Sequence, residues 1–276
     1  MKKSKVAFRL AYLGTNYAGF QAQPGRQTVQ GAVVEALRRL QLIEEVGAAN
    51  FTASGRTDKG VHAVAAVISF ETENSALAIP RRVNTQLPAD IWTWARAEVP
   101  RTFNARRDAV LRAYQYVLCD EMLDVAAMRE AADLLPGVHN FRNFSLEKRQ
   151  SAVRTIFSSD VYESAGFIVI DVAADSFVWK MMRKLVSAIT LVGKAQRSVE
   201  WFGEMLNPDA HAEGIRSAPA SGLILARVEY DSIDFQQDPY AKKKARTEVH
   251  KALVQNTLMA QVLKRFNERM GANTAN

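Results

Sequence analysis

Short runs of apolar and alternating residues predict strands along the chain, and stretches of helical spacing lie between them. In the first part of the chain such runs predict strands at 6–13, 51–54, 64–70 and 91–99. Apolar residues recur at helical spacing from Val29 to Leu40, directly after Thr28, a residue type that caps helix N-termini. A short second helix is predicted at 81–87, where Pro88 stops it.

The middle of the chain repeats this mixture of elements. Apolar and alternating runs predict strands at 111–118, 153–159, 167–173 and 223–230. Helical spacing predicts helices at 125–135, 180–193 and 201–206. Because strands and helices interleave without strict alternation, the pattern favours an α+β fold over a doubly wound parallel sheet.

Charge is distributed unevenly along the 276 residues. Segments 1–104, 105–236 and 237–276 carry net charges of +5, −3 and +5, which add to +7. We predict that these segments are an N-terminal α+β domain, a C-terminal α+β domain and a basic helical tail. Positive charge at both ends favours a polyanionic partner, nucleic acid before an acidic membrane surface. A solvated surface with a modest basic excess is an equally open interpretation.

Composition also bears on the compartment. The chain is 48% hydrophobic and 24% charged and holds no run of about 18 apolar residues, so no membrane span is expected. Cys119 is the only cysteine, which excludes an internal disulfide and fits a reducing compartment. Residues 1–5 lack the apolar stretch of a signal peptide. We therefore expect a cytoplasmic protein.

The tail combines a basic start with an amphipathic pattern. Residues 242–246 carry four cations, and the residues that follow can place apolar side chains on one face of a helix, namely Val249, Leu253, Val262, Leu263 and Phe266. This pattern favours a helix that docks on the body while its basic start stays solvated. Direct contact with a nucleic acid is the alternative.

The common cofactor signatures are missing from the sequence. It contains no Walker phosphate loop, no dinucleotide-binding fingerprint and no G-x-S-x-G nucleophile elbow. The four histidines are scattered, and with a single cysteine they do not suggest a zinc site. We therefore expect chemistry that needs neither a metal nor an organic cofactor.

One segment, 55–63, combines a carboxylate with features of a functional loop. It places Asp58 between Gly55 and Gly60, two residues that allow unusual backbone angles, with Arg56 two positions before the acid. A nearby cation keeps a partly buried acid ionised, and such a carboxylate can act as nucleophile or general base. From these residues alone, a structural ion pair or a simple turn is the more common interpretation.

The same segment, with the sequence GRTDKGVHA, resembles the active-site motif of the tRNA pseudouridine synthase A (TruA) family. The resemblance extends in order over about residues 6–232. The other matching segments are 12–21, 83–91, 103–106, 112–116, 177–183 and 218–223. The tail beyond residue 233 is an addition relative to the shorter family members.

The resemblance implies a role for five residues. Asp58 would be the catalytic carboxylate, and Arg183 would pair with it. Tyr114 would lie against the target base, and Leu223 would close the apolar side of the pocket. Arg56 would help to extrude the uridine from the RNA. The sequence leaves open whether Asp58 attacks the ribose C1′ or the base C6, or only assists elimination.

The resemblance also implies a fold and a substrate. It predicts two ferredoxin-like (RRM-like) halves that share one continuous, mostly antiparallel sheet with a central active-site cleft, plus the C-terminal basic helix. The enzyme would be a homodimer that isomerises uridines at nucleotides 38, 39 and 40 of the tRNA anticodon stem-loop, without a metal or another cofactor. Two alternatives remain: a catalytically silent RNA-binding protein on the same scaffold, and a glycosidase that releases free uracil.

Overall fold

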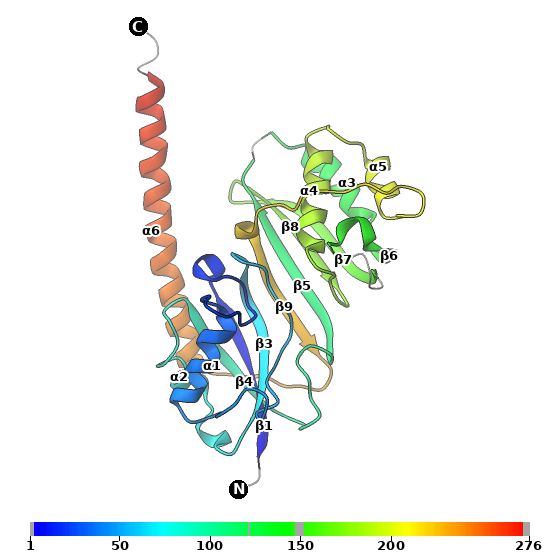
Figure 1. Ribbon diagram of the computed structural model, residues 1–276. Helices are drawn as coiled ribbons and strands as arrows, with labels where there is room; N and C mark the ends of the chain where they lie inside the picture. The colour runs from blue at the N-terminus through cyan, green and yellow to red at the C-terminus, as the bar shows by residue number, and fades with distance from the viewer. Residues whose placement is uncertain (1–2, 121, 147–151, 273–276) are drawn as a thin grey trace.

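The computed structural model describes residues 3–120, 122–146 and 152–272, and its strands form one sheet across the molecule (Figure 1). In chain order the strands are β1 (Ser4–Tyr12), β2 (Thr52–Ala53), β3 (His62–Thr72), β4 (Ile91–Val99), β5 (Ala109–Leu118), β6 (Gly137–Asn140), β7 (Val153–Ser164), β8 (Phe167–Ala174), β9 (Leu223–Tyr230) and β10 (Gln236–Gln237). The α-helices are α1 (Val29–Arg39), α2 (Pro80–Val83), α3 (Val125–Asp133), α4 (Met181–Gly193), α5 (Val199–Met205) and α6 (Pro239–Ala272).

Both halves of the sheet have the same topology. In the N-terminal half the strands lie in the order β4-β1-β3, with β2 beside β3, and in the C-terminal half the order is β9-β5-β8-β7. Numbered within each half, both orders are 4-1-3-2, which together with the intervening helices gives the β-α-β-β-α-β arrangement of ferredoxin-like folds. The predicted α+β fold with two similar halves in one mostly antiparallel sheet is confirmed.

Each half has its own hydrophobic core, and local sequence signals set the helices that cover it. Helix α1 begins where the Thr28 hydroxyl accepts a hydrogen bond from the Gly31 N–H, as predicted for a capping residue. Its residues Val33 and Leu37 are fully buried in the first core. Helix α4 buries Leu185 and Ile189 in the second core. The predicted division of the chain at 104/105 and 236/237 stays a prediction.

The two halves join where β3 and β9 run parallel, with His62 opposite Ile224 and Ala63 opposite Leu225. A few residues further along, the same edge of β3 pairs with β2 instead, with Ser69 opposite Thr52. The segment 54–61, which connects β2 to β3, therefore leaves the sheet between these two partners. The seam between the halves thus holds the loop that contains Asp58.

Helix α6 differs from the docked helix that we predicted. Its first turns pack on the edge strand β4, where Ala241 and Ala245 are buried, and Asp238 accepts hydrogen bonds from Arg81. Beyond residue 248 the helix projects past the body (Figure 1), and the apolar residues that we placed on a docked face, such as Leu253 and Phe266, are exposed. The prediction was wrong because the helix is longer than the sheet edge that it packs on.

Within the described residues, no helix combines the length and the apolar content that crossing a bilayer requires.

Candidate active site

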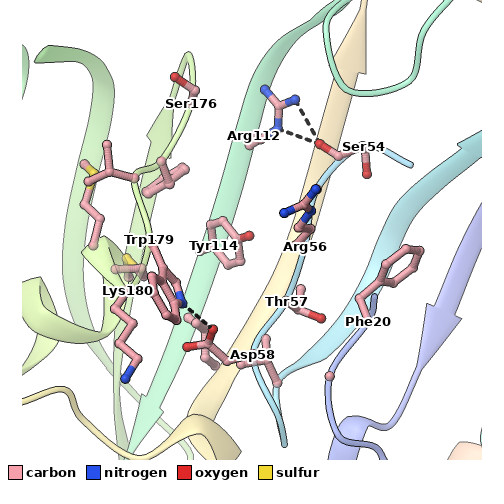
Figure 2. A pocket seen from close by; sticks show the side chains of 18 of the residues that line it. Phe20, Ser54, Arg56, Thr57, Asp58, Arg112, Tyr114, Ser176, Trp179 and Lys180 are labelled. Atoms are coloured by element: carbon pink, nitrogen blue, oxygen red, sulfur yellow. Dashed lines mark hydrogen bonds between the residues drawn. The ribbon is translucent and has the colours of Figure 1, made fainter. Parts of the chain in front are cut away.

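The loop 54–61 presents Asp58 to a cleft between the two halves (Figure 2). The preceding residue, Thr57, is buried: its hydroxyl lies 2.8 Å from the Tyr12 hydroxyl, and its carbonyl accepts a hydrogen bond from the Phe20 N–H at 3.0 Å. On the other side Gly60 has φ +84°, a conformation that favours glycine, and turns the chain back toward β3. Asp58 is thus held between an anchored neighbour and a tight turn.

Both carboxylate oxygens of Asp58 are bound by side chains from the C-terminal half. Arg183 in α4 donates from Nη1 to Oδ2 at 2.6 Å, and Trp179, just before α4, donates from Nε1 to Oδ1 at 3.1 Å. The ion pair is mostly buried, with 16% of the Arg183 side chain and 24% of the Asp58 side chain exposed. Arg183 Nε also donates to the Ala218 carbonyl at 2.7 Å, which fixes the guanidinium. The carboxylate is therefore oriented across the seam.

Arg56 does not neutralise its neighbour Asp58, which pairs with Arg183 instead. The Arg56 side chain is exposed and points into the cleft near Tyr114 (Figure 2). Within the part of the chain that the structure describes, no hydrogen bond or ion pair engages this guanidinium. Arg56 is therefore free to bind a ligand, and its predicted role stays a prediction.

Tyr114 and Leu223 form an apolar part of the cleft wall next to Asp58. The Tyr114 ring packs edge-on against Phe177, with 4.9 Å between the ring centres. Burial raises the pKa of the Tyr114 hydroxyl to about 12, so this side chain stays neutral at physiological pH. Leu223, at the start of β9, is buried and lines the same cavity. The structure brings all five predicted site residues to this one cleft.

Arg112 is a residue of this site whose role the sequence did not indicate. It is buried on β5, next to Tyr114, and its Nε and Nη2 donate to the Ser54 carbonyl at 3.1 and 2.9 Å. Nη1 donates to the Asp175 carbonyl at 3.0 Å. Burial lowers the pKa of the guanidinium. Arg112 therefore fastens the start of the Asp58 loop to the C-terminal half.

His62 makes a further link across the seam. Its Nδ1 accepts a hydrogen bond from the Gly14 N–H at 3.1 Å, and its Nε2 lies 3.2 Å from the Ser221 carbonyl. Since Nδ1 accepts, we assign the ring proton to Nε2, which donates to Ser221. Burial lowers the pKa of His62, which favours this neutral form. This histidine positions the loop rather than facing the cleft.

Trp179 was also missed by sequence reasoning. The indole is half exposed and covers Oδ1 of Asp58, and the backbone of the next residue, Lys180, is left-handed with φ +66°. The Trp179 carbonyl accepts a hydrogen bond from the Leu146 N–H at 3.2 Å. A constrained backbone therefore aims the indole at Asp58. The local sequence shows only an apolar residue before a helix.

Cations dominate the charged lining of the cleft, which has a volume of about 810 Å³. The basic residues along its wall are Arg56, Lys59, Arg106, Arg107, Arg112, Arg154, Lys180 and Arg183, whereas the acidic ones are Asp58 and Asp175. Such an excess attracts a polyanion and aligns its phosphates along the rim. The cleft therefore suits a nucleic acid that reaches one carboxylate at its base.

Comparisons with known proteins give matches over most of the chain. A family model described as tRNA pseudouridine synthase matches residues 10–106 and 131–231. The "tRNA pseudouridine synthase A" of Methanosarcina barkeri is 45% identical over 261 residues, covering 94% of this chain and 97% of that protein. The protein of the same name from Archaeoglobus fulgidus is 40% identical over 266 residues, covering 96% and 98% of the two chains.

A solved structure titled as a Cbf5-Nop10-Gar1 complex aligns with 80% of this chain and 49% of the other, at 15% identity and a TM-score of 0.37.

Proposed function

We propose that this chain, which belongs to the tRNA pseudouridine synthase family, isomerises uridine to pseudouridine in the tRNA anticodon stem-loop, with Asp58 as its catalytic carboxylate. Membership makes the chain an isomerase that modifies tRNA. The targets in this proposal are nucleotides 38, 39 and 40, and the enzyme works as a cytoplasmic homodimer. The observation that carries the role of Asp58 is the pair of hydrogen bonds from Arg183 and Trp179 that orients its two oxygens.

The chemistry needs little beyond an oriented carboxylate. The bond between uracil N1 and ribose C1′ breaks, the base rotates, and a bond forms between C5 and C1′. The C5 proton is lost and N1 gains a proton, so nothing is oxidised or hydrolysed. Asp58 can act by attack on C1′, by attack on C6 or by assisting the elimination. In each case Arg183 holds the carboxylate in place by its ion pair.

The remaining site residues would bind the extruded uridine. Tyr114 lies beside Asp58 and offers its ring to the base, a contact worth roughly 1–3 kcal/mol. Leu223 closes the apolar side of the pocket. Arg56 projects into the same space with no partner among the described residues, and it would fill the position of the flipped nucleotide in the RNA or hold its phosphate.

Trp179→Phe tests whether the indole N–H matters for turnover. The variant keeps an aromatic ring but removes a hydrogen bond to a charged acceptor, so we expect kcat to fall roughly tenfold with KM changed by less than about twofold. Trp179→His retains a donor and should recover part of the rate. Trp94→Phe is the matched control, because it loses a 2.9 Å bond to the Val64 carbonyl far from the cleft. Equal losses in both phenylalanine variants would contradict the positioning role.

The basic rim predicts a salt effect. In the double variant Lys59→Ala/Arg106→Ala we expect tRNA to bind more weakly, and the plot of log Kd against log salt to become shallower by about 1.5, because two phosphate contacts are lost. Turnover at saturating tRNA should change little. The control is Lys251→Ala/Lys264→Ala on α6, away from the cleft. An unchanged slope in the rim variant, measured by filter binding, would exclude these contacts.

A tritium-release assay tests the proposed function. With tRNA labelled at uridine C5, the synthase releases tritium, whereas a silent RNA-binding protein releases none. A glycosidase would instead liberate free uracil, which chromatography detects. Mapping pseudouridine in tRNA from a strain that lacks this protein should show losses at nucleotides 38, 39 and 40. Losses elsewhere would leave the reaction standing but refute the proposed targets.

A further inference from the structure

The part of α6 beyond the body exposes a row of large apolar side chains. Exposed fractions reach 60% at Leu263, 63% at Phe266 and 71% at Met270. Single exposed apolar residues are ordinary, but a continuous row marks an interaction site. Helices in proteins gain most of their stability from packing an apolar face rather than from intrinsic propensity. This face of α6 is therefore suited to a partner.

The spacing of the row is that of a coiled coil. Met259, Leu263, Phe266 and Met270 take the a and d positions of this repeat, and the same spacing of four and three residues continues toward the body through Asn256 and Ala252. Other exposed apolar residues lie outside this row, among them Leu253, Val254 and Leu258. We call this row the α6 seam. A repeat of alternating three and four residues keeps one seam facing a second helix along its length. The expected partner is therefore another helix.

Charge argues against RNA as the partner. Residues 252–263, the middle of the exposed segment, contain no charged side chain. Among the distal cations, Lys264 and Arg265 occupy the b and c positions, off the seam, and Arg269 occupies a g position beside it. A surface that binds phosphates would place its cations on the contact face.

The α6 seam has the symmetry of a pair of identical antiparallel helices. Ala252 then lies opposite Met270 of the other copy, Asn256 opposite Phe266, and Met259 opposite Leu263. Small side chains thus meet large ones toward the ends of the pair, and two large ones meet near its centre. Ala260 and Val262 flank the seam near its centre. Each lies close to the same residue of the other copy and extends the apolar contact.

The base of α6 determines the direction of pairing. The seam continues the face that buries Ala241 and Ala245 against the body of its own chain. A parallel partner in register would need the space that this body occupies. An antiparallel partner overlaps only the projecting part of α6, which Figure 1 shows free of the body.

We propose that residues 252–270 of α6 form an antiparallel coiled coil with the same segment of a second copy of this chain. This inference deepens the proposed function and rests on it only for the expectation of a dimer. It places the contact of this chain in the tail that the shorter family members lack. Its tests measure mass and cross-linking, so their outcome does not depend on catalysis.

The first test compares molar masses by sedimentation equilibrium of the full chain. We expect a wild-type dimer and a monomer for Met259→Asp/Leu263→Asp, with circular dichroism as a check that the body stays folded. The matched control, Val254→Asp/Gln261→Asp, places the same charges on the opposite face of the helix and should stay dimeric. A monomeric wild type, or a dimer that survives the seam variant, would overturn the proposal. If the wild type is monomeric and removal of residues 249–276 abolishes tRNA binding, the tail contacts RNA instead.

The second test determines helix direction by disulfide formation in a Cys119→Ser background. Chains with Ala252→Cys should not cross-link to one another, but should cross-link when mixed with chains carrying Met270→Cys. Val262→Cys, near the two-fold axis, should cross-link with itself. Ready linkage of Ala252→Cys chains to each other would show parallel pairing and refute the antiparallel arrangement.

Discussion

Asp58→Asn should abolish pseudouridine formation while tRNA affinity stays within about twofold of wild type. Asparagine has nearly the same size, so the loop and the cleft remain. It lacks the negative charge that attacks or assists in every form of the mechanism, and loss of such a group lowers turnover by on the order of 10⁴-fold. Single-turnover measurements with labelled tRNA, together with filter binding, separate the two quantities.

Asp160→Asn is the control for this experiment, because Asp160 is an exposed carboxylate on β7 outside the cleft lining. It should turn over at the wild-type rate. Residual activity near wild type in Asp58→Asn would remove Asp58 from the mechanism and leave the family assignment intact. A parallel loss of tRNA affinity would instead indicate that the loop had misfolded.

Much of the fold could be predicted from local patterns. Helix α1 follows from apolar spacing and the Thr28 cap, and the structure shows both. The long strands follow from runs of apolar residues. Short elements such as β6 and β10, of four and two residues, were missed because they are too short to show a period. Helix α6 was predicted, but amphipathic spacing cannot tell whether a face meets the body, another chain or water.

Only those residues of the candidate site that belong to a recognisable motif could be predicted from the sequence. The resemblance named Asp58 and Arg183, and the structure places them 2.6 Å apart although 125 residues separate them in sequence. The same reasoning missed Trp179 and Arg112. Each stands in an ordinary local context, and its role comes from long-range contacts, to Asp58 and to the Ser54 carbonyl. Such contacts exist only after both halves have folded together.

Arg183→Met should be the second most damaging change. It leaves Oδ2 of Asp58 without its cation and frees the carboxylate to rotate away from the base. We expect turnover to fall by on the order of 10²–10³-fold, since a misplaced catalytic group costs about this much. Arg183→Lys keeps the charge, but lysine cannot bind both Asp58 and the Ala218 carbonyl as the guanidinium does, so we expect an intermediate loss of roughly tenfold.

The control for these variants is Arg129→Met on α3, whose Nε donates to the Val161 carbonyl at 3.0 Å. It loses an arginine that binds a backbone carbonyl, as Arg183 does, but it lies outside the cleft lining and should keep its turnover. Full activity of Arg183→Met would show that Asp58 does not depend on the ion pair for its orientation.

A double-mutant cycle in stability separates the ion pair from general packing. Removing one partner of a mostly buried pair leaves a charge without compensation, so Arg183→Met should lower the free energy of unfolding by about 2 kcal/mol, below the range for full burial because the pair is partly exposed. In the Asp58→Asn background the loss of unfolding free energy on Arg183→Met should be smaller by about 1 kcal/mol, because a neutral amide needs no cation. Urea unfolding of the four proteins measures this difference. Equal costs in both backgrounds would mean that Arg183 stabilises the fold through the Ala218 carbonyl alone.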